Sequence, residues 1–258
     1  MTDGFSKVSM TNRVVAITGG TGGIGRATAL LCAARDARVV IADINEQLGN
    51  DLVEEIRKAG GKAAYKKTDV TNEDDVQALV AFAVSTFGGL NAAFNNAGLE
   101  TGLTPFSDFS LEQWQKGVSV NLTGVFLCVK HQIRHMLANG GGSIVNTSSV
   151  SGVTGFPMSV DYVAAKHGVV GVTRAAAAEV SDKGIRVNAL VPGATETPMF
   201  LKLIDGNDAI RQVVESKHPM GRVGQPTELA EAAAWLLSDA SSFATGACMT
   251  VDGGYTAL

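Results

Sequence analysis

The chain has 258 residues, of which 45% are hydrophobic and 18% charged, a composition typical of a globular protein and not of a disordered chain. Its formal net charge of −4 leaves no basic stripe to neutralise phosphates, so we expect no nucleic-acid partner. No apolar run reaches the roughly 20 residues of a membrane helix, and residues 1–12 lack the apolar region of a signal peptide. Three widely spaced cysteines indicate reduced thiols, and we predict a cytoplasmic protein with no membrane partner.

A strand, a glycine-rich turn and a helix follow one another near the start of the chain. Residues 13–18 are predicted as a buried strand and residues 26–35 as a helix, and GGTGGIG occupies positions 19–25 between them. Glycines let the backbone approach a pyrophosphate, and a helix N-terminus directs N–H groups toward it. The sequence therefore predicts a phosphate cradle for a dinucleotide. The expected contacts are Gly19, Thr21, Gly23, Ile24 and Gly25.

The next two predicted strands lead to acidic residues. Residues 38–43 end at Asp43, which in a dinucleotide fold faces the adenosine ribose; the alternative is a cap for the following helix. Residues 62–68 are followed by Asp69, which either contacts the adenine or caps the helix predicted at 72–87.

Amide residues mark the middle of the chain. Residues 90–95 are predicted as the fourth strand, and NNAG at 95–98 closes it. Such residues at a strand's carboxyl end suit close contact with a ligand, or they form an ordinary turn. Residues 110–137 are predicted as one long helix containing Asn121, which is either a satisfied core amide or the holder of a water near the site.

A phenol and an amine share one face of the helix predicted at 161–182. Tyr162 and Lys166 are four residues apart, so their side chains are neighbours. A cation beside a phenol favours the phenolate and lowers the pKa of the phenol from its ordinary value of about 10. The pair is therefore a candidate general acid/base that moves a proton on or off a hydroxyl group.

Two serines end the strand predicted at 143–148. Because side chains alternate along a strand, Ser148 and Ser149 point in different directions and only one of them can face the site. The other is then a strand-end or turn hydroxyl.

The rest of the chain continues the alternation of strands and helices. An amphipathic, breakable segment at 195–216 is either a lid over the substrate or a plain surface helix. The alternation predicts an α/β fold in which helices cover both faces of a parallel sheet, as in Rossmann-type dinucleotide-binding domains, with no second domain within residues 1–258. The remaining predicted elements are strand 185–191, helix 226–238 and strand 248–251.

Taken together, these residues resemble the short-chain dehydrogenase/reductase family of the NAD type, over nearly the whole chain. The resemblance implies a single doubly wound domain with about seven parallel strands, in agreement with the alternation above. It rests on TGGTGGIG at 18–25, NNAG at 95–98, Asn121, Ser149, Tyr162 with Lys166, and Pro192 with Gly193.

The resemblance also implies roles at the reaction centre. Tyr162 is the proton donor or acceptor, and Lys166 lowers its pKa while binding the nicotinamide ribose. Ser149 rather than Ser148 polarises the substrate oxygen, and Asn121 holds a water that links Lys166 to solvent. No metal is implied, since the four histidines do not form a His-Glu-x-x-His motif.

Cofactor contacts and an oligomeric state follow from the same resemblance. Family members commonly pair through two long helices, here 110–137 and 161–182, so we expect a homotetramer. The loop from 192 to 197 should pack against the nicotinamide half of the cofactor. Further cofactor contacts are expected from Val70, Asn95, Ala97, Gly98, Tyr162, Lys166, Pro192, Gly193, Thr195 and Thr197.

The substrate is expected to be a small-molecule alcohol or ketone. Phe156, Met158, Met199 and Phe200 suggest an apolar pocket that favours lipophilic or cyclic alcohols, and Glu100 adds one polar contact. The predicted activity is therefore NAD-dependent interconversion of a secondary alcohol and its ketone. Alternatives are a reductase of carrier-bound 3-oxoacyl groups, usually NADP-dependent, and a non-catalytic NAD-binding sensor.

Overall fold

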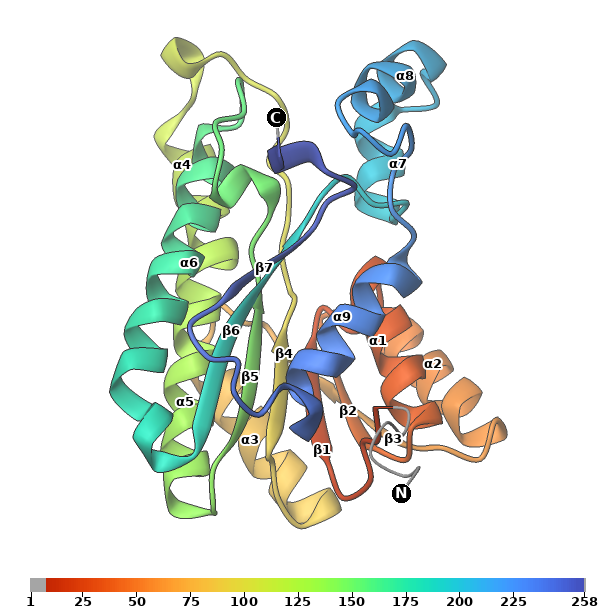
Figure 1. The fold of residues 1–258 in the computed structure, drawn as a ribbon, viewed down its shortest axis with the longest axis vertical. Helices are drawn as coiled ribbons and strands as arrows, with labels where there is room; N and C mark the ends of the chain where they lie inside the picture. Colours follow the sequence, from red (N-terminus) through yellow and green to blue (C-terminus); the bar gives the residue numbers. More distant parts are fainter. Residues whose placement is uncertain (1–7, 258) are drawn as a thin grey trace.

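The computed structural model describes residues 8–257; residues 1–7, part of the polar start considered above, and residue 258 lie outside the described residues. Seven strands form one parallel sheet in the order β3-β2-β1-β4-β5-β6-β7, which confirms the predicted α/β Rossmann-type fold (Figure 1). The strands are β1 (Val14–Thr18), β2 (Arg38–Asp43), β3 (Lys62–Lys67), β4 (Ala92–Asn95), β5 (Gly142–Thr147), β6 (Ile185–Pro192) and β7 (Cys248–Val251).

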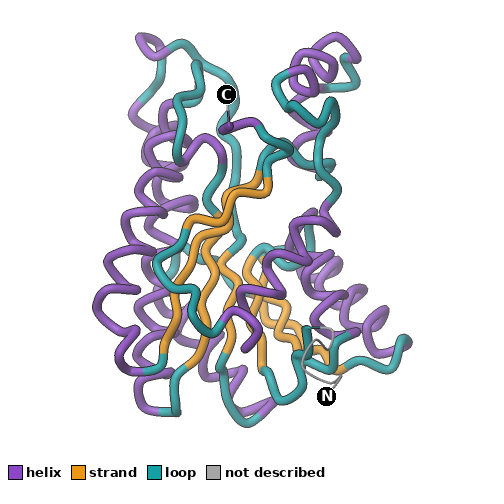
Figure 2. The backbone as a smooth tube through the Cα atoms, in the orientation of Figure 1, coloured by secondary structure: helices purple, strands orange, loops and turns teal. Residues whose placement is uncertain are grey.

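Helices cover both faces of the sheet (Figure 2). Because side chains alternate along a strand, Val15 and Ile17 of β1 pack on one helical layer while Val14 and Ala16 pack on the other. The first layer consists of α1 (Gly23–Ala34), α2 (Glu46–Lys58) and α9 (Pro226–Leu237). The second contains α3 (Glu73–Phe87), α5 (Gly124–Ala138) and α6 (Val160–Val180).

The order of the strands reverses at β1, which pairs with β2 on one side and β4 on the other. Ligands of open α/β sheets bind outside the carboxyl ends of the strands at such a switch point. Here the two strand ends are joined: the hydroxyl of Thr18 accepts the backbone N–H groups of Asn96 at 3.1 Å and Ala97 at 3.2 Å. The glycine-rich turn after β1 and the NNAG turn after β4 therefore lie against each other.

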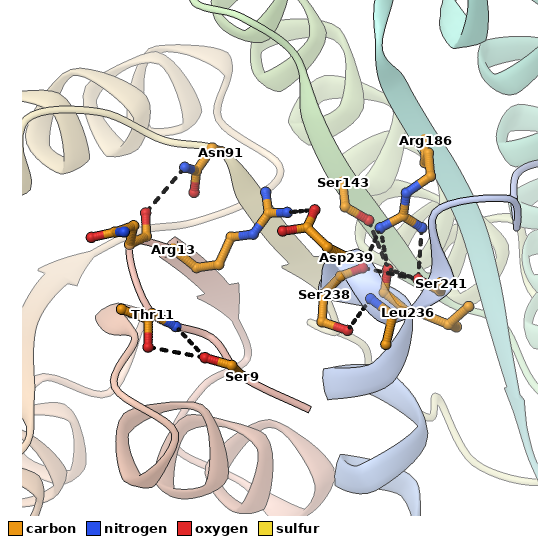
Figure 3. Close-up of polar contacts among 12 residues, drawn as sticks. Ser9, Thr11, Arg13, Asn91, Ser143, Arg186, Leu236, Ser238, Asp239 and Ser241 are labelled. Atoms are coloured by element: carbon orange, nitrogen blue, oxygen red, sulfur yellow. Dashed lines mark hydrogen bonds and ion pairs between the residues drawn. The ribbon is translucent and has the colours of Figure 1, made fainter. Parts of the chain in front are cut away.

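A separate polar network lies at the opposite, amino-terminal ends of the strands (Figure 3). Arg186 of β6 donates to the carbonyl oxygens of Leu236 at 3.0 Å and Ser238 at 2.7 Å, at the end of α9. Arg13, just before β1, forms an ion pair with Asp239. These contacts fasten α9 to the amino ends of the strands and leave the carboxyl ends available for a site.

The helix predicted at 110–137 is present but contains a π-helical turn. Residues 110–137 form α4 (Leu111–Val118), a π-helical turn at Ser119–Thr123, and α5. The irregular turn contains Asn121, whose side chain bonds to the backbone of Leu99 on the neighbouring segment. That tertiary contact, rather than local helix propensity, accounts for the interruption.

The predicted lid segment is helical. Residues 195–216 contain α7 (Pro198–Ile204) and α8 (Asp208–Ser216), which lie beyond the carboxyl ends of the strands (Figure 1). Among residues 8–257, no helix combines the length and apolar character needed to span a membrane.

Candidate active site

Tyr162, Lys166 and Ser149 converge where β5 ends and α6 begins. The Nζ atom of Lys166 lies 5.3 Å from the centroid of the Tyr162 ring and donates to the carbonyl oxygen of Thr147 at 2.8 Å. Ser149 lies two residues after the end of β5, and its side chain interacts with the phenol of Tyr162. The structure thus places a hydroxyl from the loop after β5 beside a phenol and an amine that lie one helical turn apart on α6.

The electrostatics of this group differ from the sequence-based expectation. Burial raises the pKa of the Tyr162 phenol, the nearby Glu100 raises it further, and the hydrogen bond with Ser149 opposes both. Burial also lowers the pKa of Lys166 to about 8, against an opposing effect of Glu100. The expected lowering of the phenol pKa by Lys166 is therefore absent in the free protein, because desolvation weakens the ammonium and the phenolate alike.

The two serines have different surroundings. The hydroxyl of Ser148 is 1% exposed and donates to the carbonyl oxygen of Lys166 at 2.9 Å, which fixes the start of α6 against β5. Ser149 instead accepts from the backbone N–H of Ser151 at 3.1 Å and contacts Tyr162. Of the two serines, Ser149 is the one that interacts with Tyr162, and its contact with a substrate oxygen stays a prediction.

Asn121 is fully buried, and both atoms of its amide are satisfied. It accepts from the backbone N–H of Leu99 at 3.0 Å and donates to the carbonyl oxygen of Leu99 at 2.9 Å. A Cβ on Gly98 would lie 2.9 Å from the Asn121 oxygen and 3.6 Å from Nζ of Lys166. The structure therefore supports the interpretation of Asn121 as a satisfied amide, and a water near Lys166 stays a prediction.

The glycine-rich turn is shaped to receive an anion. Helix α1 begins after Gly22 with no side-chain cap, and a Cβ on Gly22 would meet no atom within 4 Å. Gly19 has φ +60°, and a Cβ there would lie 2.8 Å from Cα of Ala97, so only glycine fits. Free N–H groups at a helix start, open space and close backbone packing fit the pyrophosphate of a dinucleotide.

Asp43 faces this turn from the end of β2. Its carboxylate accepts from the hydroxyl of Thr21 at 2.7 Å and the backbone N–H of Thr21 at 3.2 Å. The alternative role as a helix cap is wrong, since Asn45 caps α2 by accepting from the N–H of Leu48 at 3.1 Å. Asp43 is thus positioned where a ribose diol would lie in a dinucleotide fold.

The surroundings of Asp43 contain one cation that the sequence argument missed. Lys67 of β3 is the direct partner of Asp43 in the parallel register, so both side chains leave the same face of the sheet. Arg26 is engaged in an ion pair with Glu55, and Arg38 donates to the carbonyl oxygen of Phe87 at 2.8 Å. Lys67 is therefore the basic residue to consider when cofactor preference is argued.

Asp69 does not cap α3. Its carboxylate accepts from the backbone N–H of Thr71 at 2.9 Å and the hydroxyl of Thr71 at 2.7 Å, while Asn72 caps the helix. The neighbouring Val70 is buried against Leu127. The remaining possibility for Asp69, a contact with the adenine, stays a prediction.

Asn95 does not point toward the cradle. Its side-chain nitrogen donates to Gln132 at 2.9 Å and to Asn146 at 2.9 Å, and Asn146 donates to Thr173 at 3.0 Å. These side chains form a buried network between the sheet and the helices α5 and α6. Asn96 is the amide that faces the site, since it donates to the carbonyl oxygen of Gly19 at 3.2 Å. The Asn95 side chain is therefore withdrawn from the predicted cofactor contacts, and Asn96 is the amide beside the glycine-rich turn.

The loop after β6 meets the glycine-rich turn. A Cβ on Gly23 would lie 2.6 Å from the methyl carbon of Thr197, and Thr197 caps α7. Thr195 is buried and its hydroxyl donates to the carbonyl oxygen of Gly193 at 3.0 Å. Thr197 therefore lies beside the cradle, and the loop that leads to it begins where β6 ends at Pro192.

Two acidic side chains, Glu100 and Asp161, lie near Tyr162. Burial and the neighbouring Asp161 raise the pKa of Glu100 to about 7, while Ser159 and Lys166 oppose the rise. Asp161 is fully buried; one carboxylate oxygen accepts from Thr101 at 2.7 Å and the other has no protein partner. The sequence argument selected Glu100 and missed Asp161, although the latter directly precedes Tyr162.

The expected apolar residues do not form one pocket. Phe156 and Met158 line a pocket of about 400 Å³ together with Phe106 and Val163, and its lining includes none of Ser149, Tyr162 and Lys166. Met199 lies on α7 and is 39% exposed. Phe200 is packed in the interior of the α7–α8 segment with Ile204 and Val223, which removes it from the candidate substrate residues.

Comparison with known proteins agrees with this geometry. A family model described as enoyl-(acyl carrier protein) reductase matches residues 19–256. A 2,5-dichloro-2,5-cyclohexadiene-1,4-diol dehydrogenase from Sphingobium indicum is 50% identical over 96% of this chain and 99% of its own length. A cyclohexanol dehydrogenase from an Acinetobacter species is 45% identical over 95% of both chains.

A solved structure gives the same assignment. A short-chain type dehydrogenase/reductase from Mycobacterium marinum superposes with a TM-score of 0.91 at 34% identity, over 97% of this chain and 98% of that protein. The match therefore extends over the glycine-rich turn, the Tyr162–Lys166 helix and the segment after β6 together. The chain belongs to the short-chain dehydrogenase/reductase family.

Proposed function

We propose that the protein is an NAD-dependent oxidoreductase that interconverts a secondary alcohol, lipophilic or cyclic, and the corresponding ketone. The observation that carries this proposal is the convergence of Ser149, Tyr162 and Lys166 beside an uncapped glycine-rich turn. A proton-transfer group and a dinucleotide cradle on one strand edge are what hydride transfer to or from an alcohol carbon requires.

The chain's own residues would handle the proton. A bound nicotinamide cofactor supplies the hydride acceptor or donor and, when oxidised, a positive charge beside the phenol. Ser149 holds the substrate oxygen by hydrogen bonding, and Tyr162 takes or gives the proton at that oxygen. Lys166 orients the ribose through its ammonium group, anchored at the carbonyl of Thr147. The proposed water near Asn121 would connect Lys166 to solvent.

Substrate class is proposed from the relatives and from the site. The two relatives named above are, by their names, dehydrogenases of a cyclohexadienediol and of cyclohexanol. Phe156 and Met199 are retained as the apolar contacts of this proposal, and Glu100 near Tyr162 as one polar contact. These features favour a six-membered cyclic alcohol over a sugar.

A panel assay tests the activity. Initial rates should be followed at the nicotinamide absorbance with NAD and cyclohexanol, an acyclic secondary alcohol, a sugar alcohol and a 3-hydroxyacyl thioester. We expect the highest kcat/KM for cyclohexanol. Preference for the thioester would instead establish the acyl-reductase alternative, and binding of NAD without turnover of any alcohol would establish the sensor alternative.

We propose that residues 1–258 form a single domain whose segment 195–216 acts as a lid, and that the protein is a cytoplasmic homotetramer. Exposed Phe126 and Leu137 on α5 are suited to a twofold contact between copies. Light scattering at micromolar concentration should give about four times the 26.7 kDa mass of one chain; the mass of a single chain would contradict this.

A further inference from the structure

His218 joins two segments through opposite nitrogens of one ring. It lies in the turn after α8 and is 3% exposed. Its Nδ1 lies 2.8 Å from the carbonyl oxygen of Val214, and its Nε2 lies 3.2 Å from the backbone nitrogen of Ala194. The carbonyl can only accept and the backbone N–H can only donate, so the ring is neutral with its hydrogen on Nδ1.

The packing around this ring is tight. A Cβ on Gly193 would lie 2.9 Å from Nε2 of His218 and 2.8 Å from Cα of Asp252. On the other side, the ring of Tyr255 lies with its centroid 5.2 Å from that of His218. Because close-packed interiors transmit displacements rather than absorb them, a shift of Ala194 has to move His218 and the end of α8.

The Ala194 end of the joint leads to the glycine-rich turn. The carbonyl oxygen of Ala194 accepts from the N–H of Gly224 at 2.8 Å, and the N–H of Glu196 donates to the carbonyl of Gly224 at 2.9 Å. One residue further, Thr197 lies against Gly23 in the proposed phosphate cradle. A bound dinucleotide that orders this loop would therefore also order the acceptor side of His218.

We propose that His218 is a positioning residue that couples cofactor binding to the placement of the α7–α8 segment over the substrate. The inference rests on the proposed function, since it takes the loop after β6 as part of the cofactor site. Coupling of this kind is reciprocal. A substrate that orders α8 increases the affinity for the cofactor, and the cofactor increases the affinity for the substrate by the same factor.

A second connection between the same segments supplies a control. Arg211 of α8 binds both carboxylate oxygens of Glu196 at 2.8 Å. Both side chains are more than a quarter exposed, and solvent weakens such ion pairs. If coupling depends on the buried ring, the isosteric change Glu196→Gln should leave it in place.

Two conservative variants separate the two hydrogen bonds of His218. In His218→Asn the amide nitrogen replaces Nδ1, so the bond to Val214 is kept and the bond to Ala194 is lost. In His218→Gln the amide oxygen replaces Nε2, so the bond to Ala194 is kept and the bond to Val214 is lost. A purely structural role predicts that both variants weaken binding in proportion to their loss of thermal stability.

The test is fluorescence titration of the full chain with NADH, with and without saturating cyclohexanol, a pair that cannot react with each other. In the unmodified protein cyclohexanol should lower the Kd of NADH by at least about 5-fold. His218→Asn should raise the Kd of NADH alone about 10-fold and abolish the effect of cyclohexanol. His218→Gln should keep the Kd of NADH alone within about 2-fold but also abolish the effect.

Three outcomes with the unmodified protein and the His218 variants would overturn the inference, and a fourth concerns Glu196→Gln. The three are a cyclohexanol effect that survives in both His218 variants, an effect absent from the unmodified protein, and Kd values that merely follow the melting temperatures. Loss of the effect in Glu196→Gln as well would assign the coupling to the segment as a whole and not to His218. An unmodified protein that binds no NADH would refute the proposed cofactor site, a result distinguishable from failure of the coupling alone.

Discussion

The carboxylate of Asp43 accepts hydrogen bonds from both the hydroxyl and the backbone N–H of Thr21, so the end of β2 is tied to the glycine-rich turn. We expect kcat/KM for NAD to exceed that for NADP by about 100-fold, because a 2′-phosphate would bring negative charge against this carboxylate. Asp43→Ala should reduce the ratio of kcat/KM for NAD to that for NADP, mainly by lowering kcat/KM for NAD. Initial rates with both cofactors measure it, and parity in the unmodified protein would contradict the assignment.

Lys67 provides the matched control for this preference. It is the register partner of Asp43 and the cation available to balance a 2′-phosphate. Lys67→Ala should leave use of NAD unchanged and weaken NADP further. If the variant impaired both cofactors equally, the residue would have to be assigned to general binding rather than to discrimination.

Tyr162→Phe keeps the ring and removes the oxygen that transfers the proton. Turnover should fall by about 100-fold or more, the lower range of a general acid/base contribution. The Kd of NADH should change little. Steady-state kinetics together with an NADH titration check both parts, and normal turnover in the variant would remove Tyr162 from the mechanism.

The two serines should separate chemistry from stability. Ser149→Ala removes the hydroxyl that contacts Tyr162, and we expect a large loss of kcat with an unchanged melting temperature. Ser148→Ala removes the buried bond to the carbonyl of Lys166 and should lower the free energy of unfolding by about 1–2 kcal/mol while reducing kcat far less. The reverse ranking in kcat would show that Ser148 is the substrate-facing residue.

Glu100 should shift the pH dependence of alcohol oxidation. Its charge raises the pKa of Tyr162, and oxidation needs the phenolate, so Glu100→Gln should move the rising limb of kcat to lower pH by about 1 unit. A full pH profile of kcat with saturating cyclohexanol measures the shift. A limb that stays in place would mean that the carboxylate is too well solvated to act on the phenol.

Stability offers an independent check on the same carboxyl group. Its pKa is raised to about 7 in the folded protein by burial and by Asp161, with Ser159 and Lys166 opposing, so the folded state holds the proton more tightly than the unfolded state. Stability from this group is present below its unfolded value of about 4.3 and is lost as the pH rises through about 7. Glu100→Gln should therefore raise the melting temperature relative to that of the unmodified protein, and this increase should be larger at pH 8 than at pH 5.

The fold was predictable because strand and helix periods alternate without interruption, and the joint spacing of the glycine-rich turn with Tyr162 and Lys166 located the site. The direction of single side chains was not. Asn95 and Asn96 are equivalent in the sequence, but the strand register opposes Asn95 to Asn146 inside the sheet and leaves Asn96 at the carboxyl edge. Only the pairing of β4 with β5 decides between them.

Distances between segments likewise could not be predicted from the sequence. Lys67 lies beside Asp43 because β3 pairs with β2, although 23 residues separate the two in the sequence. The expected lowering of the Tyr162 pKa failed for a similar reason: the sequence shows that Lys166 is close, but it does not show how much water both groups lose on folding. Burial is a property of the whole packing and not of a motif.

The π-helical turn at Ser119–Thr123 sets the rotational phase between α4 and α5. Gly117 lies against Asp161, where a Cβ would come within 1.9 Å of the carboxylate, and Gly124 lies against Val70, within 2.7 Å by the same measure. A regular helix with one residue fewer between these glycines would rotate α4 by about 100° relative to α5. Either the contact of Gly117 with Asp161 or that of Gly124 with Val70 would then be lost. A fully regular helix therefore cannot keep both glycine contacts. We expect a single-residue deletion in this turn to give a more regular helix but to displace Asp161 and, with it, the neighbouring Tyr162.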